Sequence, residues 1–154
     1  MTLVVEHAMS VLIVEDNAFT RKLLRAMVRQ IPVRDVLEAG NGSIALDVLR
    51  TRPVDIILLD WTMPTMGGKT FLAHLPDVRF WEKEGGRPAV LVITAHAKRS
   101  IVLEAAEAGA DGVVAKPISP KLLKERLLGV YGHVRTPRAV EPETPHSADS
   151  VVMI

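Results

Sequence analysis

Five side chains of this 154-residue sequence combine types that could together act on a phosphoryl group: Glu15, Asp16, Asp60, Thr94 and Lys116. Clustered carboxylates repel one another and need a cation. Oxygen ligands without cysteine or clustered histidine favour magnesium. A lysine and a hydroxyl add a positive charge and a hydrogen-bond donor. The set predicts phosphoryl transfer, in which a cation and the lysine offset phosphoryl charge and one carboxylate is the nucleophile.

Each of these residues lies at or just after the end of a short apolar run. Asp60 ends the run "VDIILLD" and precedes a helix-breaking, glycine-rich turn, "WTMPTMGG". The five runs span residues 10–14, 35–39, 54–60, 89–94 and 111–115. They are rich in Val, Ile and Leu, and three are nearly continuous. This pattern indicates β-strands that are covered on both faces.

Amphipathic helical patterns follow the strands. Apolar residues recur every four positions in the first, and Pro32 ends it. Gly109 stops the fourth helix, and the fifth begins at a Ser119 cap with Pro120 in its first turn. The apolar residues of the fifth helix are expected to face inward. Helix by helix, the apolar residues that mark the five patterns are Phe19, Leu23, Met27 and Ile31; Ile44, Val48 and Leu49; Phe71, Leu72 and Leu75; Ile101, Val102, Ala105 and Ala106; and Leu122, Leu123, Leu127 and Leu128.

Strand and helix therefore alternate five times, which predicts an α/β fold with a doubly wound parallel sheet and helices on both faces. Ligands of such sheets bind beyond the carboxyl ends of the strands. Because those ends converge on one edge, the five side chains are expected to meet there.

Each residue alone has an ordinary structural interpretation. Asp60 could cap a helix, as could Glu15 and Asp16 before Asn17. Thr94 could close a turn, and Lys116 could simply be solvated. The order argues against coincidence, because an acidic pair, an aspartate, a threonine and a Lys-Pro pair stand at the ends of successive strands, with only the second strand contributing nothing.

Composition narrows the class of protein. Hydrophobic residues make up 48% of the chain, the net charge is +1 and there is no cysteine, so we expect a sizeable core without disulfides or thiolate metal sites. We find no basic stripe for DNA, no apolar run of about 18 residues for membrane insertion, and no signal peptide. The expectation is a cytoplasmic protein.

One domain is predicted over residues 9–133. Residues 1–8 are interpreted as an N-terminal extension, since Met9 could be the natural start. Residues 134–154 are proline-rich without periodicity, so we expect a disordered tail and no second folded domain. The final "VVMI" is either an irregular end or a small docking strip.

The motifs "VLIVEDN", "DIILLDWTMPTMGG", "VITAHA" and "GADGVVAKPIS" resemble those of the receiver domain of two-component response regulators, the CheY-like family. The resemblance covers about Met9 to Tyr131. It implies the flavodoxin-like fold with strand order 2-1-3-4-5, and a stand-alone, single-domain type.

The resemblance also implies roles for the acidic residues. Asp60 matches the phosphoacceptor, which takes its phosphoryl group from a sensor histidine kinase or a histidine phosphotransfer protein. Asp16 matches the main Mg²⁺ ligand, with Asp60 and the Thr62 backbone carbonyl completing the set. Glu15 matches the first acid of the pair, which usually acts through metal-bound water.

Further positions follow from the same resemblance. Thr94 matches the switch hydroxyl, and Lys116 the lysine that pairs with a phosphoryl oxygen. Lys116–Pro117 is a candidate cis peptide bond. Thr62 and His96 match positions that tune dephosphorylation. The implied protein is no enzyme beyond self-catalysed phosphotransfer and autodephosphorylation.

Two features depart from the family pattern. Val113 stands where many members carry Tyr or Phe, so the usual aromatic switch is missing or replaced. The segment 73–88 is longer than usual and carries Phe80 and Trp81, which either pack on the domain or bind a partner. His74, in the same segment, is expected to be solvated. Output is expected through contact with an unidentified protein or through phosphate relay.

Two other classes of protein are alternatives to a phosphorylated receiver. A pseudo-receiver keeps the fold as a docking module, but loses an acid or the lysine, and all are present here. An aspartyl-phosphate phosphatase carries D-x-D-x-T after its first strand, and that pattern fails here.

Overall fold

The computed structural model describes residues 9–78, 87–135 and 152–153. The predicted N-terminal extension, Phe80 and Trp81, and most of the predicted tail lie outside these ranges. No helix in the described ranges is long and apolar enough to cross a membrane.

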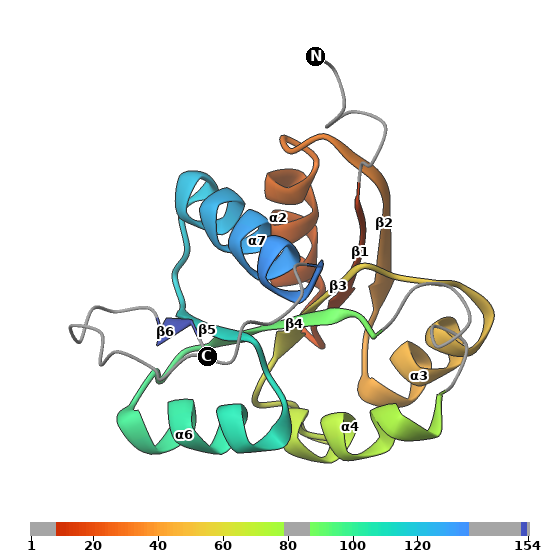
Figure 1. The fold of residues 1–154 in the computed structure, drawn as a ribbon, viewed down its shortest axis with the longest axis vertical. Coiled ribbons are helices and arrows are strands. Elements are labelled where there is room, and N and C mark those ends of the chain that lie inside the picture. The colour runs from red at the N-terminus through yellow and green to blue at the C-terminus, as the bar shows by residue number, and fades with distance from the viewer. Residues whose placement is uncertain (1–8, 79–86, 136–151, 154) are drawn as a thin grey trace.

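A single sheet organises the described residues (Figure 1). Its strands are β1 (Met9–Val14), β2 (Val33–Ala39), β3 (Ile56–Asp60), β4 (Ala89–Thr94), β5 (Gly112–Ala115) and β6 (Val152–Met153). Their order is β2-β1-β3-β4-β5-β6. The first five strands are parallel, which confirms the predicted order 2-1-3-4-5. The sixth is an addition: part of "VVMI" pairs antiparallel with β5.

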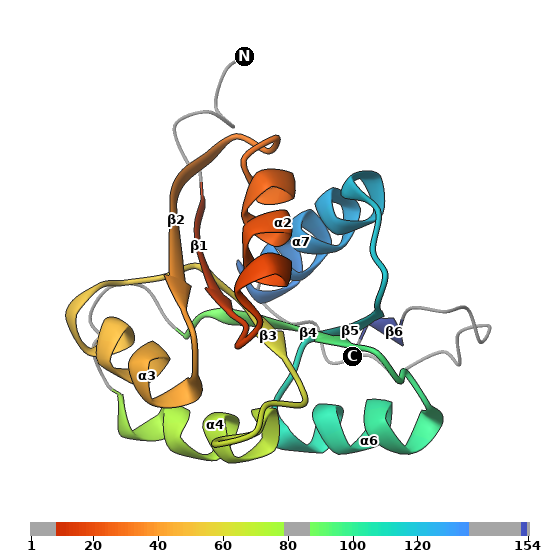
Figure 2. The same cartoon turned by 180° about the vertical axis from the view of Figure 1, so that it is seen from behind.

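Helices cover both faces of the sheet. They are α2 (Ala18–Val28), α3 (Gly42–Thr51), α4 (Gly68–His74), the short 3-10 helix η1 (Leu75–Asp77), α6 (Arg99–Ala108) and α7 (Pro120–Arg135). Helices α2 and α7 lie on one face, and α3, α4 and α6 lie on the other (Figures 1 and 2). Helix α7 runs two residues beyond the predicted domain boundary at 133.

Two hydrophobic cores follow from this arrangement. Alternate residues of a strand point to opposite faces, so Leu12 and Val14 of β1 join the core under α3, α4 and α6. Val11 and Ile13 join the core under α2 and α7. Strands buried on both faces explain the nearly continuous apolar runs of the sequence.

The predicted apolar stripe of the first helix is wrong for Phe19 and Leu23, although Ile31 is buried and Met27 packs against the core. Phe19 and Leu23 are 71% and 45% exposed, whereas Leu24 and Val28 are buried. Residues four apart advance by about 40° around a helix, so a four-residue stripe rotates away from the sheet. The helix also ends at Val28, before Pro32.

Two other predicted apolar positions face solvent. Leu128 was expected to face inward in α7 but is 42% exposed, while Leu123, Leu127 and Val130 are buried. Ile44, which marked the second helix, is 47% exposed. Both helices carry more apolar residues than one buried stripe can hold, and packing against the sheet decides which ones are covered.

The predicted helix boundaries at Ser119 and Gly109 are confirmed. Ser119 Oγ accepts a hydrogen bond from the backbone N–H of Leu122 at 3.1 Å, as an N-cap does. Gly109 ends α6 with φ of 108°, a left-handed conformation that side chains disfavour.

Candidate functional site

The carboxyl ends of four neighbouring strands bring the predicted residues together. Glu15 and Asp16 follow β1, Asp60 ends β3, Thr94 ends β4 and Lys116 follows β5. These strands are adjacent in the sheet, so chain segments up to 101 residues apart meet at one edge. The second strand contributes no residue to this set, as the sequence indicated.

Three carboxylates form the centre of the site. Oxygen atoms of Glu15, Asp16 and Asp60 all lie within 4.8 Å of one another. Glu15 and Asp60 are buried, whereas Asp16 is exposed. The donors are all carboxylate oxygens and one faces solvent. This set fits Mg²⁺, which prefers oxygen ligands and usually keeps several waters.

Lys116 neutralises part of this charge. Its Nζ lies 3.1 Å from Glu15 Oε1 and 3.5 Å from Asp60 Oδ1. Partial burial disfavours the ammonium ion, but attraction from Asp60 and Glu15 outweighs that effect and raises the pKa of Lys116. Lys116 therefore remains charged and hydrogen-bonded beside both acids.

Asp60 is the most strongly perturbed acid. Burial and the negative charge of Glu15 raise its pKa to about 7, against the opposing attraction of Lys116 and a hydrogen bond with the Thr62 backbone. Two buried carboxylates beside one ammonium remain short of positive charge. A cation bound among the acids would favour the ionised form of Asp60, which is the nucleophilic form.

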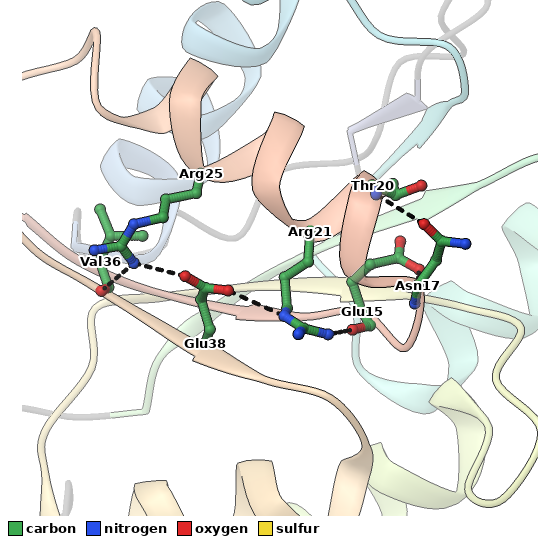
Figure 3. A network of polar contacts seen from close by, with 7 residues as sticks. All are labelled: Glu15, Asn17, Thr20, Arg21, Arg25, Val36 and Glu38. Carbon is green, nitrogen blue, oxygen red and sulfur yellow. Dashed lines mark hydrogen bonds and ion pairs between the residues drawn. The ribbon is translucent and has the colours of Figure 1, made fainter.

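A polar network on the α2 side holds the acidic loop in place (Figure 3). Arg21 Nη1 donates to the backbone carbonyl of Glu15 at 2.8 Å. Arg21 Nε pairs with Glu38 of β2 at 3.0 Å, and Arg25 holds the other oxygen of Glu38 at 2.8 Å. Glu15 also accepts from the N–H of Asn17 at 3.1 Å. Sequence analysis missed this network, because Glu38 meets Arg21 only once β2 packs beside α2.

The loop after β4 carries Thr94 and His96. The buried Thr94 hydroxyl oxygen accepts from the backbone N–H of His96 at 3.1 Å, so Thr94 does close a turn. Its O–H hydrogen can still donate to another group. His96 and Thr62 are both exposed, each two residues beyond a residue of the site.

Strand β5 carries Val113 and leads to the Lys116–Pro117 peptide bond. The Lys116–Pro117 peptide bond is cis, as predicted. Val113 is 1% exposed in the core, paired in register with Val92 of β4 and Val152 of β6.

Trp61 is a residue that sequence analysis passed over. It directly follows Asp60, and its indole Nε1 donates to Glu104 Oε1 of α6 at 3.0 Å. An apolar side chain placed next to a strand-end acid could have signalled a packed loop, but its partner on α6 could not be read from the sequence.

This chain belongs to the response regulator receiver domain family, which it matches over residues 11–128. It is therefore a CheY-like receiver domain of a two-component system, as the sequence motifs indicated.

Chemotaxis proteins are among its relatives. The chain is 36% identical over 126 residues to chemotaxis protein CheY of Pseudomonas aeruginosa, a match that covers 82% of this chain and 98% of that protein. It is 35% identical over 131 residues to CheY-3 of Vibrio cholerae, covering 85% of this chain and 98% of that protein.

Solved structures show the same fold. Vibrio cholerae chemotaxis protein CheY4 superposes with a TM-score of 0.70 at 26% identity, covering 80% of this chain and 98% of that one. The receiver domain of Saccharomyces cerevisiae Ssk1, solved with the histidine phosphotransfer protein Ypd1, gives a TM-score of 0.72 at 20% identity, covering 84% and 92%. The latter likeness concerns the fold alone.

Proposed function

We propose that this chain is a single-domain response regulator that takes a phosphoryl group onto Asp60 from a histidine kinase or a histidine phosphotransfer protein. The observation that carries the proposal is the setting of Asp60. It is a buried carboxylate at a strand end, with Lys116 Nζ 3.5 Å away and two further acids within 4.8 Å.

The proposed reaction is a single phosphoryl transfer. A carboxylate oxygen of Asp60 forms a bond to phosphorus, the bond between phosphorus and the donor's histidine nitrogen breaks, and that nitrogen keeps the electron pair. The product is an acyl phosphate on Asp60. Lys116 would pair with a phosphoryl oxygen, and the contact between its Nζ and Asp60 supports this role.

Mg²⁺ would supply further positive charge for the phosphoryl oxygens. Asp16, Asp60 and the Thr62 carbonyl would hold it, with Glu15 acting through a bound water. Proximity of the three acids and the exposure of Asp16 support this assignment.

The remaining site residues are assigned to the conformational response to phosphorylation and to hydrolysis of the acyl phosphate. The Thr94 hydroxyl would donate to a phosphoryl oxygen, which is a stronger acceptor than its neutral neighbours. Thr62 and His96 are exposed beside the site and would tune the access of the water that hydrolyses the acyl phosphate. Output would follow from protein contact or from relay of the phosphate, and the chain would turn over no other substrate.

The acceptor is tested by Asp60→Asn. Incubation of the wild type with Mg²⁺ and acetyl phosphate should add one acid-labile phosphoryl group, and the variant should take none, because an amide is not a nucleophile for phosphorus. Intact-mass spectrometry reads the product. Asp47→Asn, an exposed aspartate on α3, is the matched control and should be labelled normally. Equal labelling of wild type and Asp60→Asn would refute the proposal, and an unlabelled wild type would favour a docking module.

The metal site is tested by Asp16→Asn. The Mg²⁺ concentration that gives half-maximal labelling should rise about tenfold or more, because a lost charge-assisted contact costs roughly 1.5–3 kcal/mol. An unchanged Mg²⁺ titration would place the ligand elsewhere.

A further inference from the structure

The residue after the proposed phosphoacceptor contacts a distant helix. Trp61 is 6% exposed, and its indole Nε1–H donates to Glu104 Oε1 on α6 at 3.0 Å, across 43 residues of sequence. An indole N–H paired with a carboxylate is a charge-assisted hydrogen bond, and this one is partly buried. It is therefore stronger and better defined than an exposed contact.

The backbone of Trp61 is fixed on both sides. Its N–H donates to the carbonyl of Ile93, the residue before Thr94, at 3.0 Å. Its carbonyl accepts from the N–H of Gly68, the first residue of α4, at 2.9 Å. A displacement of the Asp60–Trp61 peptide would therefore move the start of α4 and the end of β4 with it.

The buried Trp61 ring also packs against the start of α4. Gly68 lies against the ring so closely that a Cβ there would collide with Cε3. Helices α4 and α6 lie side by side over the same face of the sheet (Figures 1 and 2). Because the ring packs closely against Gly68, movement of the loop would be passed to Glu104 through the hydrogen bond.

A second contact of Glu104 contributes less. Its Oε2 lies 3.8 Å from Lys69 Nζ of α4, but these side chains are 41% and 70% exposed. Exposed pairs at this distance contribute little, so the bond to Trp61 is the one that matters.

Val113 of β5 stands where the resemblance to the receiver family implies an aromatic side chain. Val113 is buried and β-branched, so its side chain has little rotamer freedom. We propose that the Trp61–Glu104 hydrogen bond transmits changes at Asp60 to α6, with Trp61 and Glu104 as positioning residues. This inference rests on the proposed function of Asp60.

The experiment compares the response of α6 in matched variants. Amide NMR shifts of residues 99–108 are recorded with Mg²⁺, before and after addition of beryllofluoride, a phosphoryl mimic. Glu104→Ala removes the acceptor, and Trp61→Phe keeps a ring but removes the donor. Glu107→Ala removes an exposed carboxylate from the same helix and is the control. Glu104→Gln keeps an acceptor oxygen and should rescue the response.

The expected result is a response of α6 that is at least about twofold smaller in Glu104→Ala and in Trp61→Phe. The double variant should lose no more than either single variant, because both remove the same bond. The hydrogen bond itself is read from the Trp61 indole N–H resonance. The chain has two tryptophans, and Trp61→Phe identifies this signal. Glu104→Ala should shift that resonance upfield.

Two outcomes separate this inference from the proposed function. An α6 response in Glu104→Ala equal to that in Glu107→Ala, with normal acetyl phosphate labelling at Asp60, would overturn the Trp61–Glu104 link alone. Failure to label the wild type would overturn the proposed function. If Trp61→Phe unfolds, Glu104→Ala still decides the question, since Glu104 is only partly buried.

Discussion

At the scale of single residues, Asp60 has unusual chemistry because of where it lies. A surface carboxyl group is ionised at neutral pH. Asp60 is 6% exposed beside Glu15, and its pKa is about 7. The site therefore favours binding of positive charge, and Lys116 is the positive side chain that contacts both acids.

This perturbed pKa predicts how stability depends on pH without metal. The folded pKa of Asp60, about 7, lies above its ordinary value of 3.8, so the folded protein keeps a proton that the unfolded chain releases. The free energy of unfolding should fall as pH rises from about 4 to about 7, by on the order of a few kcal/mol. Below that window this contribution is fully present.

Urea unfolding in EDTA, at about pH 5 and about pH 8, measures the effect. The wild type should lose more stability between these values than Asp60→Asn, in which the group does not titrate. Mg²⁺ should reduce the loss, because a cation stabilises the carboxylate. Identical losses in wild type and variant would contradict the prediction.

At the scale of elements, a partly buried ion pair joins β4 to β5 at their amino ends, opposite the site. Asp111 is 3% exposed and binds Arg87 through both oxygens, at 2.6 and 2.9 Å. It also accepts from the backbone N–H of Val90 at 2.8 Å. Hydrogen bonding to Asp111 raises the pKa of Arg87, so Arg87 stays charged. The two strands that carry Thr94 and Lys116 are thereby held together.

Asp111→Ala should be destabilising, because it leaves the buried Val90 N–H without its acceptor, whereas the half-exposed Arg87 can be hydrated. We expect a loss of about 1–3 kcal/mol in the free energy of unfolding, measured in urea. Asp47→Ala breaks an exposed pair with Arg50 and is the control, with an expected change of at most about 0.5 kcal/mol. Equal losses of stability from the two substitutions would show that Asp111 does not hold β4 and β5 together.

At the scale of the whole molecule, β6 covers the edge of the sheet. Val152 pairs with Val113, and Met153 pairs with Gly112. An uncovered edge strand presents free backbone groups to other chains. The apolar end of the sequence therefore does dock, on the strand that leads to Lys116.

Deletion of residues 136–154 tests the role of β6. We expect a small loss of stability, about 1–2 kcal/mol, or a melting temperature lower by about 2–8 °C, because few hydrogen bonds are removed. The exposed β5 edge should promote association at high concentration, measured by analytical ultracentrifugation. Labelling at Asp60 should persist. An unchanged melting temperature and a strictly monomeric variant would contradict a stabilising β6.

The amino-acid sequence by itself determined the alternation of strands and helices and which residues gather at one edge of the sheet, while the strand order came from the resemblance to the receiver family. Apolar runs, turn residues and caps such as Ser119 are local signals, and parallel topology then places strand-end residues together. Asp60, Thr94 and Lys116 could therefore be placed at one edge before any contact was known. Their roles, and the limits of the domain, stay predictions.

Only the tertiary structure decided which side chains meet. Helix α2 buries Leu24 and Val28 and exposes Phe19, although all three residues are apolar. The bond from Trp61 to Glu104 joins positions 43 residues apart. Such contacts depend on which elements pack against each other and at what rotation. A local sequence pattern cannot specify the packing partner or the rotation of a helix. Several faces of one helix can be similarly hydrophobic, and only folding decides which face is buried.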